Sequence, residues 1–189
     1  MSQKCPMKNT IYYLPGMGGH LGSGLGQGLL SRGYHVTGRE TTGEFRDLKF
    51  QSQIDAIAED LRANFWYEDS KVIANSFGAY LFLHAQSQLE PYIGKVMLLS
   101  PIVGEFENEG IGRRFIPPRA SRLFELARSG SYPAPKNCEI HVGSEDWQSN
   151  PTAVTAFGTM LGLDVTVVPN AGHMLGKDYV GNLLDKWLS

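Results

Sequence analysis

Residues Ala74-Asn75-Ser76-Phe77-Gly78 place a serine between two small residues. An apolar, β-branched run ends just before this stretch, and an apolar run typical of a helix follows it. A serine on a sharp turn between a strand and a helix holds its hydroxyl in open space, where it can attack a carbonyl carbon. The flanking residues must be small because the turning backbone packs closely against its neighbours, although Ala74 stands where glycine is usual. The pattern predicts a nucleophilic Ser76, with a helix N-cap serine as the alternative interpretation.

A serine nucleophile needs a base, and the base needs a carboxylate that orients it. His173 follows the last expected strand and precedes the last expected helix. Loops after parallel strands meet at one edge of a sheet, so we expect His173 near Ser76. Asp146 follows the fifth expected strand and is the expected carboxylate, with Glu145 as the alternative. His35, His84 and His141 are expected to be packed or surface side chains, whereas His20, in a glycine-rich loop, is a candidate for lining the pocket.

The elements that position these side chains alternate along the chain. Short apolar runs alternate with helical patterns, which predicts an α/β protein with a doubly wound, mostly parallel sheet of six strands between two layers of helices. Strands are expected at residues 10–14, 35–38, 71–74, 95–99, 139–142 and 164–168, with five helices between them and a sixth at the end. Ser52 with Asp55 predicts a capping box, and Asn150-Pro151 predicts another helix start, with Gly162 at its end.

Residues 104–137 do not fit this alternation. Four prolines surround one expected helix, at residues 121–128, and connections of this length are typically lids or binding loops. We expect one domain over residues 1–189, in which residues 104–137 form a small cap, called here the cap segment. Its Phe106 and Phe115 either line an apolar acyl pocket or anchor the segment to the sheet. Its five arginines either bind an anionic part of a substrate or form a solvent-exposed charged face.

Composition narrows the function classes. The chain has 189 residues and a net charge of −2, which gives no general attraction to nucleic acid or to an anionic membrane. No apolar run reaches the roughly 20 residues that span a bilayer, and no secretory signal is evident, so a cytoplasmic location is expected. Two cysteines, Cys5 and Cys138, indicate neither a disulfide framework nor a zinc site, and a bond between them is disfavoured in the cytosol. The composition does not decide between a monomer and a homo-oligomer.

From Ile11 to the C-terminus the chain resembles the α/β-hydrolase family. The order Ser76, Asp146, His173 is the order of that family. Gly143-Ser144-Glu145-Asp146 with Pro151 is similar to its Gly-x-x-Asp pattern followed by a proline, and Gly172-His173-Met174 is similar to its Gly-His-apolar pattern. The resemblance implies a catalytic triad, a sheet without the first two antiparallel strands of the full fold, and an oxyanion hole formed by the N–H groups of Phe77 and Met17. Many relatives have His-Gly where this chain has Pro15-Gly16.

The expected function is hydrolysis of carboxylic esters with small or medium acyl groups, through an acyl-enzyme at Ser76 and without a metal or an organic cofactor. Thioesters, amides and lactones would use the same residues. One alternative is a hydrolase fold that binds a ligand with slow or no turnover. Another is a dinucleotide-binding protein, because a glycine-rich turn is followed by Glu40, although Leu21 stands where the third glycine belongs.

Overall fold

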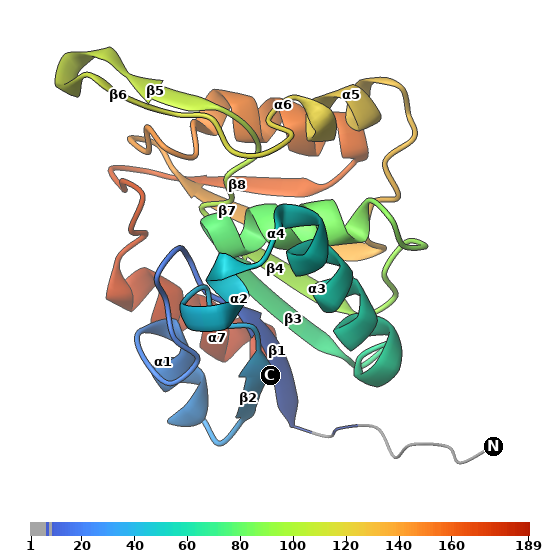
Figure 1. Ribbon diagram of the computed structural model, residues 1–189. Coiled ribbons are helices and arrows are strands. Elements are labelled where there is room, and N and C mark those ends of the chain that lie inside the picture. Colours follow the sequence, from blue (N-terminus) through green and yellow to red (C-terminus); the bar gives the residue numbers. More distant parts are fainter. Residues whose placement is uncertain (1–6, 8) are drawn as a thin grey trace.

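Six parallel strands form the central sheet of the computed structural model, which describes Met7 and residues 9–189 (Figure 1). The strand order is β2-β1-β3-β4-β7-β8, and every neighbouring pair runs parallel. The strands are β1 (Thr10–Leu14), β2 (His35–Gly38), β3 (Lys71–Asn75), β4 (Lys95–Leu99), β7 (Asn137–Gly143) and β8 (Asp164–Val168). The predicted α/β class and all six predicted strand positions are confirmed to within two residues.

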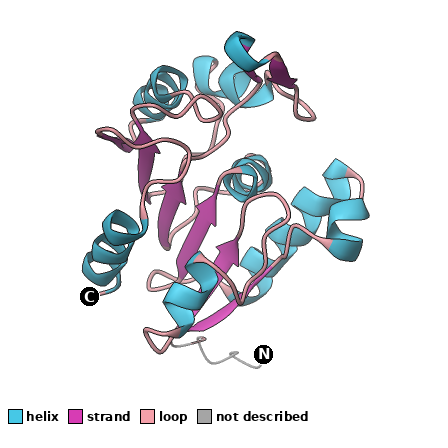
Figure 2. Ribbon diagram, turned by 90° about the vertical axis from the view of Figure 1, so that its left-hand side faces the viewer, coloured by secondary structure: helices cyan, strands magenta, loops and turns pink. Residues whose placement is uncertain are grey.

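Helices cover both faces of this sheet (Figure 2). Successive side chains of a strand point to opposite faces, so Ile11 and Tyr13 enter one core cluster while Tyr12 and Leu14 enter the other. The first cluster is closed by α1 (Leu25–Leu30) and α7 (Lys177–Leu188), and the second by α3 (Phe50–Asn64), α4 (Phe77–Gln86) and α6 (Pro151–Leu161). All but the first residue of α4 are buried, as expected for a helix whose residues are mostly apolar.

Two predicted helix starts have different outcomes. The side chain of Asn150 accepts hydrogen bonds from the N–H groups of Thr152 and Ala153 at 3.0 and 3.1 Å, and Pro151 is the first residue of α6, as predicted. The capping box at Ser52 is wrong, because α3 begins at Phe50. The observed N-cap is Lys49, three residues before Ser52, and the Phe50 ring packs on the rings of Tyr80 and His84. A short helix that the sequence did not predict, α2 (Gly43–Asp47), precedes α3.

The cap segment contains more regular structure than its sequence predicts. It begins with an antiparallel hairpin of β5 (Phe106–Asn108) and β6 (Arg113–Phe115), joined by the 3₁₀ helix η1 (Glu109–Ile111), and continues to α5 (Arg122–Arg128). Residues of α4 hold the segment. The Tyr80 hydroxyl donates to the carbonyl of Pro118 at 2.6 Å, and the Gln86 side chain donates to the carbonyl of Pro133 at 2.9 Å. The helix that follows Ser76 therefore also supports the cap segment.

Cys138 lies in β7 as a buried, free thiol, and burial raises its pKa well above the ordinary value for cysteine. Cys5, its only conceivable partner in the sequence, falls outside the described residues. Over the part of the chain that the structure describes, no helix has both the length and the apolar character needed to cross a membrane.

Candidate active site

Ser76 occupies the sharp turn between β3 and α4, with φ 52° and ψ −121°. The turn is tight because α4 packs directly on the loop after β1. A side chain at Gly78 would come within 2.2 Å of the Leu14 carbonyl oxygen and 2.3 Å of that of Pro15, so only glycine fits there. Although Ser76 precedes the helix, its hydroxyl caps no N–H group of α4. The Oγ atom instead lies 2.8 Å from His173 Nε2, which disfavours the N-cap interpretation.

His173 joins Ser76 to Asp146. Its Nδ1 atom lies 2.9 Å from Oδ2 of Asp146 and 3.1 Å from Oδ1. An ionised carboxylate only accepts hydrogen bonds, so this contact assigns the imidazole proton to Nδ1. Nε2 is then free to accept the hydrogen bond of the Ser76 hydroxyl. The structure thus brings together the three side chains that the sequence selected, in the order that a proton relay requires.

The carboxylate of Asp146 is fully buried, and both of its oxygens form hydrogen bonds. Besides its contact with His173, its Oδ1 atom accepts the N–H groups of Gln148 and Ser149, each at 2.9 Å. A buried carboxylate is tolerated when it is paired and hydrogen-bonded in this way. The alternative acid, Glu145, has an exposed side chain, and its backbone N–H donates to the carbonyl of Ala171. Asp146 is therefore the carboxylate of this site.

Backbone contacts hold the loops of Asp146 and His173 together. A side chain at Gly143 would come within 2.2 Å of the Ala171 carbonyl oxygen and 2.3 Å of that of Gly172, so the end of β7 touches the histidine loop directly. Ser100 connects the same loops, because its hydroxyl donates to the His173 carbonyl at 2.9 Å and its own carbonyl accepts the Ser149 hydroxyl at 2.6 Å. No pattern in the sequence singled out Ser100 or Ser149. The one available signal was that Ser100 directly follows a strand that ends at this edge.

The N–H groups of Phe77 and Met17 are the two oxyanion donors that the resemblance implies. Phe77 is the first residue of α4, so its N–H has no acceptor within the helix. The loop after β1 lies against Ser76, since a side chain at Gly16 would come within 3.2 Å of the Ser76 Cβ. In the described part of the chain, neither the Phe77 N–H nor the Met17 N–H donates to another residue. Ser76, the residue before α4, lies at the positive end of the helix dipole.

A row of aromatic rings runs from the turn at Ser76 to the turn at Asp146. The Phe115 ring lies 6.4 Å from that of Phe77 and 5.2 Å from that of Phe106, and the Phe106 ring lies 5.6 Å from that of Trp147. The four rings are partly exposed. The structure therefore places Phe106 and Phe115 between the residue after Ser76 and the residue after Asp146. No pattern in the sequence singled out Trp147, because its contact with the cap segment depends on the β5–β6 hairpin.

His20, in the loop after β1, contacts Glu40, which follows β2, at the exposed surface. His20 Nδ1 is 3.3 Å from the Glu40 carboxylate, and the structure does not bring His20 to the triad. The same carboxylate accepts the Leu21 N–H at 2.9 Å. This hydrogen bond, and then His20, lower the pKa of Glu40. The carboxylate that a dinucleotide-binding site would offer to a ribose is thus bound to the protein's own loop.

The remaining buried histidines are packed, as expected. Burial lowers the pKa of His84 on α4 to about 4, with Arg119 and Arg122 adding to the effect. His141 Nδ1 lies 2.8 Å from the Tyr179 hydroxyl, and burial lowers the pKa of its imidazole. Within residues 9–189 and Met7, no group of three or more His, Cys, Asp or Glu side chains is placed to hold a metal ion.

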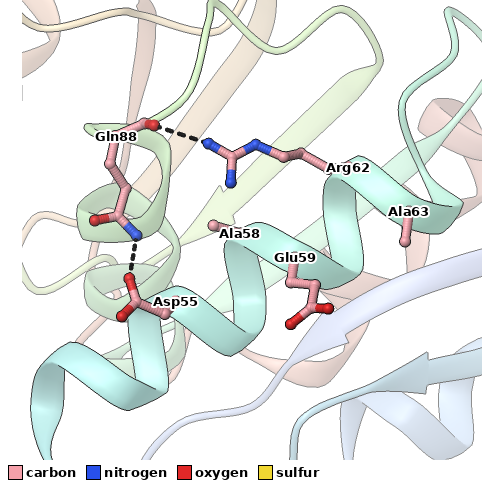
Figure 3. A pocket seen from close by; sticks show the side chains of 6 residues that line it. All are labelled: Asp55, Ala58, Glu59, Arg62, Ala63 and Gln88. Carbon is pink, nitrogen blue, oxygen red and sulfur yellow. Dashed lines mark hydrogen bonds between the residues drawn. The ribbon is translucent and has the colours of Figure 1, made fainter.

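One surface pocket lies between α3 and the loop after α4 (Figure 3). Because α4 starts directly after Ser76 and runs away from it, this pocket lies at the other end of that helix. Its polar groups bond to one another: Gln88 Nε2 donates to Asp55 at 2.8 Å, and Arg62 donates to the Gln88 carbonyl at 3.2 Å. The pocket is separate from the triad. It is lined by Asp55, Ala58, Glu59, Arg62, Ala63 and Gln88.

No protein-family model and no curated protein sequence matches this chain. Solved structures do match it in fold. The ydeN gene product of B. subtilis has a TM-score of 0.66 at 11% identity, over 95% of this chain and 98% of that one. Mouse alpha/beta hydrolase domain-containing protein 10 has a TM-score of 0.66 at 11% identity, over 98% and 91%. A structure from a study of carboxylesterases of Nitrososphaera gargenis has a TM-score of 0.61 at 14% identity, over 95% and 89%. The chain therefore has the α/β-hydrolase fold.

Proposed function

We propose that this protein is a serine hydrolase that cleaves carboxylic esters. The observation that carries the proposal is the unbroken series of hydrogen bonds from Ser76 Oγ to His173 Nε2, at 2.8 Å, and from His173 Nδ1 to Asp146, at 2.9 Å. The Ser76 hydroxyl is poorly nucleophilic by itself and is activated when a neighbouring imidazole accepts its proton. The hydrolase fold and the strained turn at Ser76, between β3 and α4, support this assignment.

The proposed reaction has two halves. Ser76 Oγ attacks the ester carbonyl carbon while His173 Nε2 takes the hydroxyl proton, and Asp146 stabilises the resulting imidazolium. The negative oxygen of the tetrahedral intermediate accepts hydrogen bonds from the N–H groups of Phe77 and Met17. His173 then returns the proton to the departing alcohol, which leaves an acyl group on Ser76. Water attacks the acyl-enzyme with His173 again as the base, and this step releases the acid and restores Ser76.

The aromatic row supports an apolar acyl group of small or medium size. Phe106, Phe115 and Trp147 are partly exposed beside the triad, and apolar rings gain free energy when a hydrocarbon chain covers them. Four of the five arginines of the cap segment already contact other side chains of the cap segment or of α3: Arg114 with Glu105, Arg119 with Gln51, Arg122 with Glu125 and Arg128 with Phe124. These contacts favour the solvent-exposed charged face over recognition of an anion.

The test is turnover of p-nitrophenyl acetate and butyrate together with labelling by a fluorophosphonate. Ser76→Ala and His173→Ala are each expected to lower kcat by about 10⁴- to 10⁶-fold, because residues of a triad act as a unit. Ser31→Ala, at an exposed serine after α1, is the matched control and should leave turnover unchanged. Turnover should fall on acidification, because only a neutral imidazole accepts the serine proton. Wild-type turnover by Ser76→Ala would refute the proposal.

The same assay separates the alternative of a binding protein with slow or no turnover. A chain that is labelled stoichiometrically at Ser76 but does not release p-nitrophenol repeatedly would have an activated serine without an efficient second half-reaction. Labelling combined with repeated turnover supports the hydrolase.

A further inference from the structure

We propose that Thr41 is a positioning residue for the oxyanion hole, an inference that rests on the proposed function. Thr41 follows β2 and is 3% exposed. In the described part of the chain it forms no hydrogen bond with Ser76, His173 or Asp146. Its partners all belong to the loop after β1, which carries the Met17 N–H group.

Thr41 forms hydrogen bonds with this loop on both sides of Met17. Its hydroxyl donates a short hydrogen bond to the Gly16 carbonyl and accepts the Gly19 N–H at 3.1 Å. Its own carbonyl accepts the Gly18 N–H at 3.1 Å. One buried residue therefore satisfies polar groups of Gly16, Gly18 and Gly19, while the Met17 N–H between them donates to no residue that the structure describes.

The Gly16 carbonyl matters because it belongs to the same peptide unit as the Met17 N–H. A trans peptide is planar, so its C=O and N–H bonds point in opposite directions. When the Thr41 hydroxyl holds the carbonyl oxygen on one side, it fixes the direction of the N–H on the other side. Gly16 also lies close to Ser76, because a Cβ added at Gly16 would come within 3.2 Å of the Ser76 Cβ. Thr41 thus sets the orientation of a donor next to the nucleophile, and its bond to the carbonyl also polarises that donor.

Thr41 can act in this way because its own position is fixed. Arg39, two residues before Thr41, forms two hydrogen bonds with Asp60 of α3, both at 2.7 Å. The Tyr12 hydroxyl donates to the same carboxylate at 2.7 Å. The carboxylate of Glu40 accepts the Leu21 N–H farther along the loop. The residues from Arg39 to Thr41 therefore form a rigid support between α3 and the loop. This support holds the geometry of Pro15-Gly16 without the histidine that many relatives have at this position.

The experiment compares Thr41→Val with Thr41→Ser. Valine has nearly the shape of threonine but lacks the hydroxyl, and serine keeps the hydroxyl. The Gly16 carbonyl retains a bond from the Gly19 N–H at 2.9 Å, so we expect Thr41→Val to fold. It should lower kcat for p-nitrophenyl butyrate by about 10- to 100-fold with little change in KM, which is less than the loss of a whole oxyanion donor, about 100- to 1,000-fold. Thr41→Ser should stay within about threefold of the wild type, since the hydroxyl remains.

A second readout separates positioning from a general structural defect. Sulfur is a weak hydrogen-bond acceptor, so a thionoester gains less from the oxyanion hole than the matching ester. Thr41→Val should therefore reduce the preference for the ester over the thionoester, whereas partial unfolding would lower both rates equally. Thr10→Val, at a buried threonine in β1, is the matched control and should leave this preference unchanged. Should Thr41→Val not fold, Thr41→Ala must give the same change.

The outcomes are distinct. A folded Thr41→Val with wild-type kcat and wild-type ester preference would overturn the role of Thr41 and leave the proposed function intact. Equal impairment of Thr41→Ser and Thr41→Val would also overturn it, because the hydroxyl would not be the cause. Absence of Ser76-dependent turnover in the wild type would refute the proposed function, and the role of Thr41 would fall with it.

Discussion

The triad edge of the sheet and the cap segment lie side by side but are held in different ways. At the triad edge, backbone lies against backbone: Gly78 touches the carbonyls after β1, and Gly143 touches the loop of His173. The cap segment instead rests on side chains, through the Tyr80 hydroxyl and the rings of Phe106 and Phe115. Backbone contacts leave no room for substitution, whereas side-chain contacts can be exchanged one at a time.

This difference predicts where changes are tolerated. Substitutions of the triad residues or of the glycines in these backbone contacts should strongly reduce turnover or stability, because their contacts are reproduced by no other residue type. Substitutions in the cap segment should alter substrate preference or stability by degrees, since each ring makes only part of the contact.

Among the substitutions that test this comparison, Asp146→Asn should have the largest effect. The amide can donate to His173 Nδ1, which favours the imidazole tautomer that cannot accept the Ser76 proton, so kcat should fall by about 10⁴-fold. The melting temperature should change little by comparison, because the amide oxygen still accepts the two N–H groups that hold Asp146. Steady-state kinetics and thermal unfolding measure the two quantities. Glu145→Gln is the control, and an equal loss there would contradict the assignment of Asp146.

Gly78→Ala tests the backbone packing of the triad edge. A methyl group there would meet two carbonyl oxygens within 2.3 Å, so we expect the free energy of unfolding to fall by about 3 kcal/mol. Gly22→Ala is the matched control, because no atom lies within 4 Å of a methyl group at that position. Urea denaturation should show a change of less than about 0.5 kcal/mol for the control. Similar stability of the two variants would remove the distinction between the two regions.

His84 tests the support of the cap segment through pH. Its pKa is lowered from 6.5 to about 4, so below pH 6.5 the unfolded chain binds a proton that the folded chain does not. The free energy of unfolding should therefore fall as the pH falls from 6.5 towards 4, by up to about 3 kcal/mol from this residue. His84→Leu should lose this part of the pH dependence. Urea denaturation of both proteins at pH 7 and pH 4.5 measures it, and identical pH dependence would count against the buried neutral imidazole.

The smallest effect is expected from Phe115→Ala. Removing this ring should lower kcat/KM for p-nitrophenyl hexanoate by about tenfold and leave the value for the acetate nearly unchanged, because only the longer chain reaches the ring. Ile111→Ala, at the exposed end of the hairpin, is the control and should affect neither ester. A uniform loss for both esters would mean that Phe115 anchors the cap segment and does not contact the substrate.

The fold and the triad geometry were accessible from the sequence because each depends on a repeated local signal. Strand and helix patterns alternate, and the loops after parallel strands must meet at one edge, so Ser76, Asp146 and His173 could be placed together without coordinates. Contacts that depend on a particular loop path were not accessible. The bonds from Thr41 to Gly16 and the ring of Trp147 against Phe106 join distant segments. The strands of the β5–β6 hairpin have only three residues each, too few for a periodic pattern.

The backbone of Ser76 has a consequence for engineering this protein. Gly24, before α1, adopts almost the same angles, φ 53° and ψ −120°, without the crowding that a Cβ causes. Strain of this kind amounts to about 1–3 kcal/mol, so glycine in place of the nucleophile would make a more heat-resistant chain. A screen for thermal survival alone would then enrich inactive molecules, and selection must reward catalysis and heat resistance in the same assay.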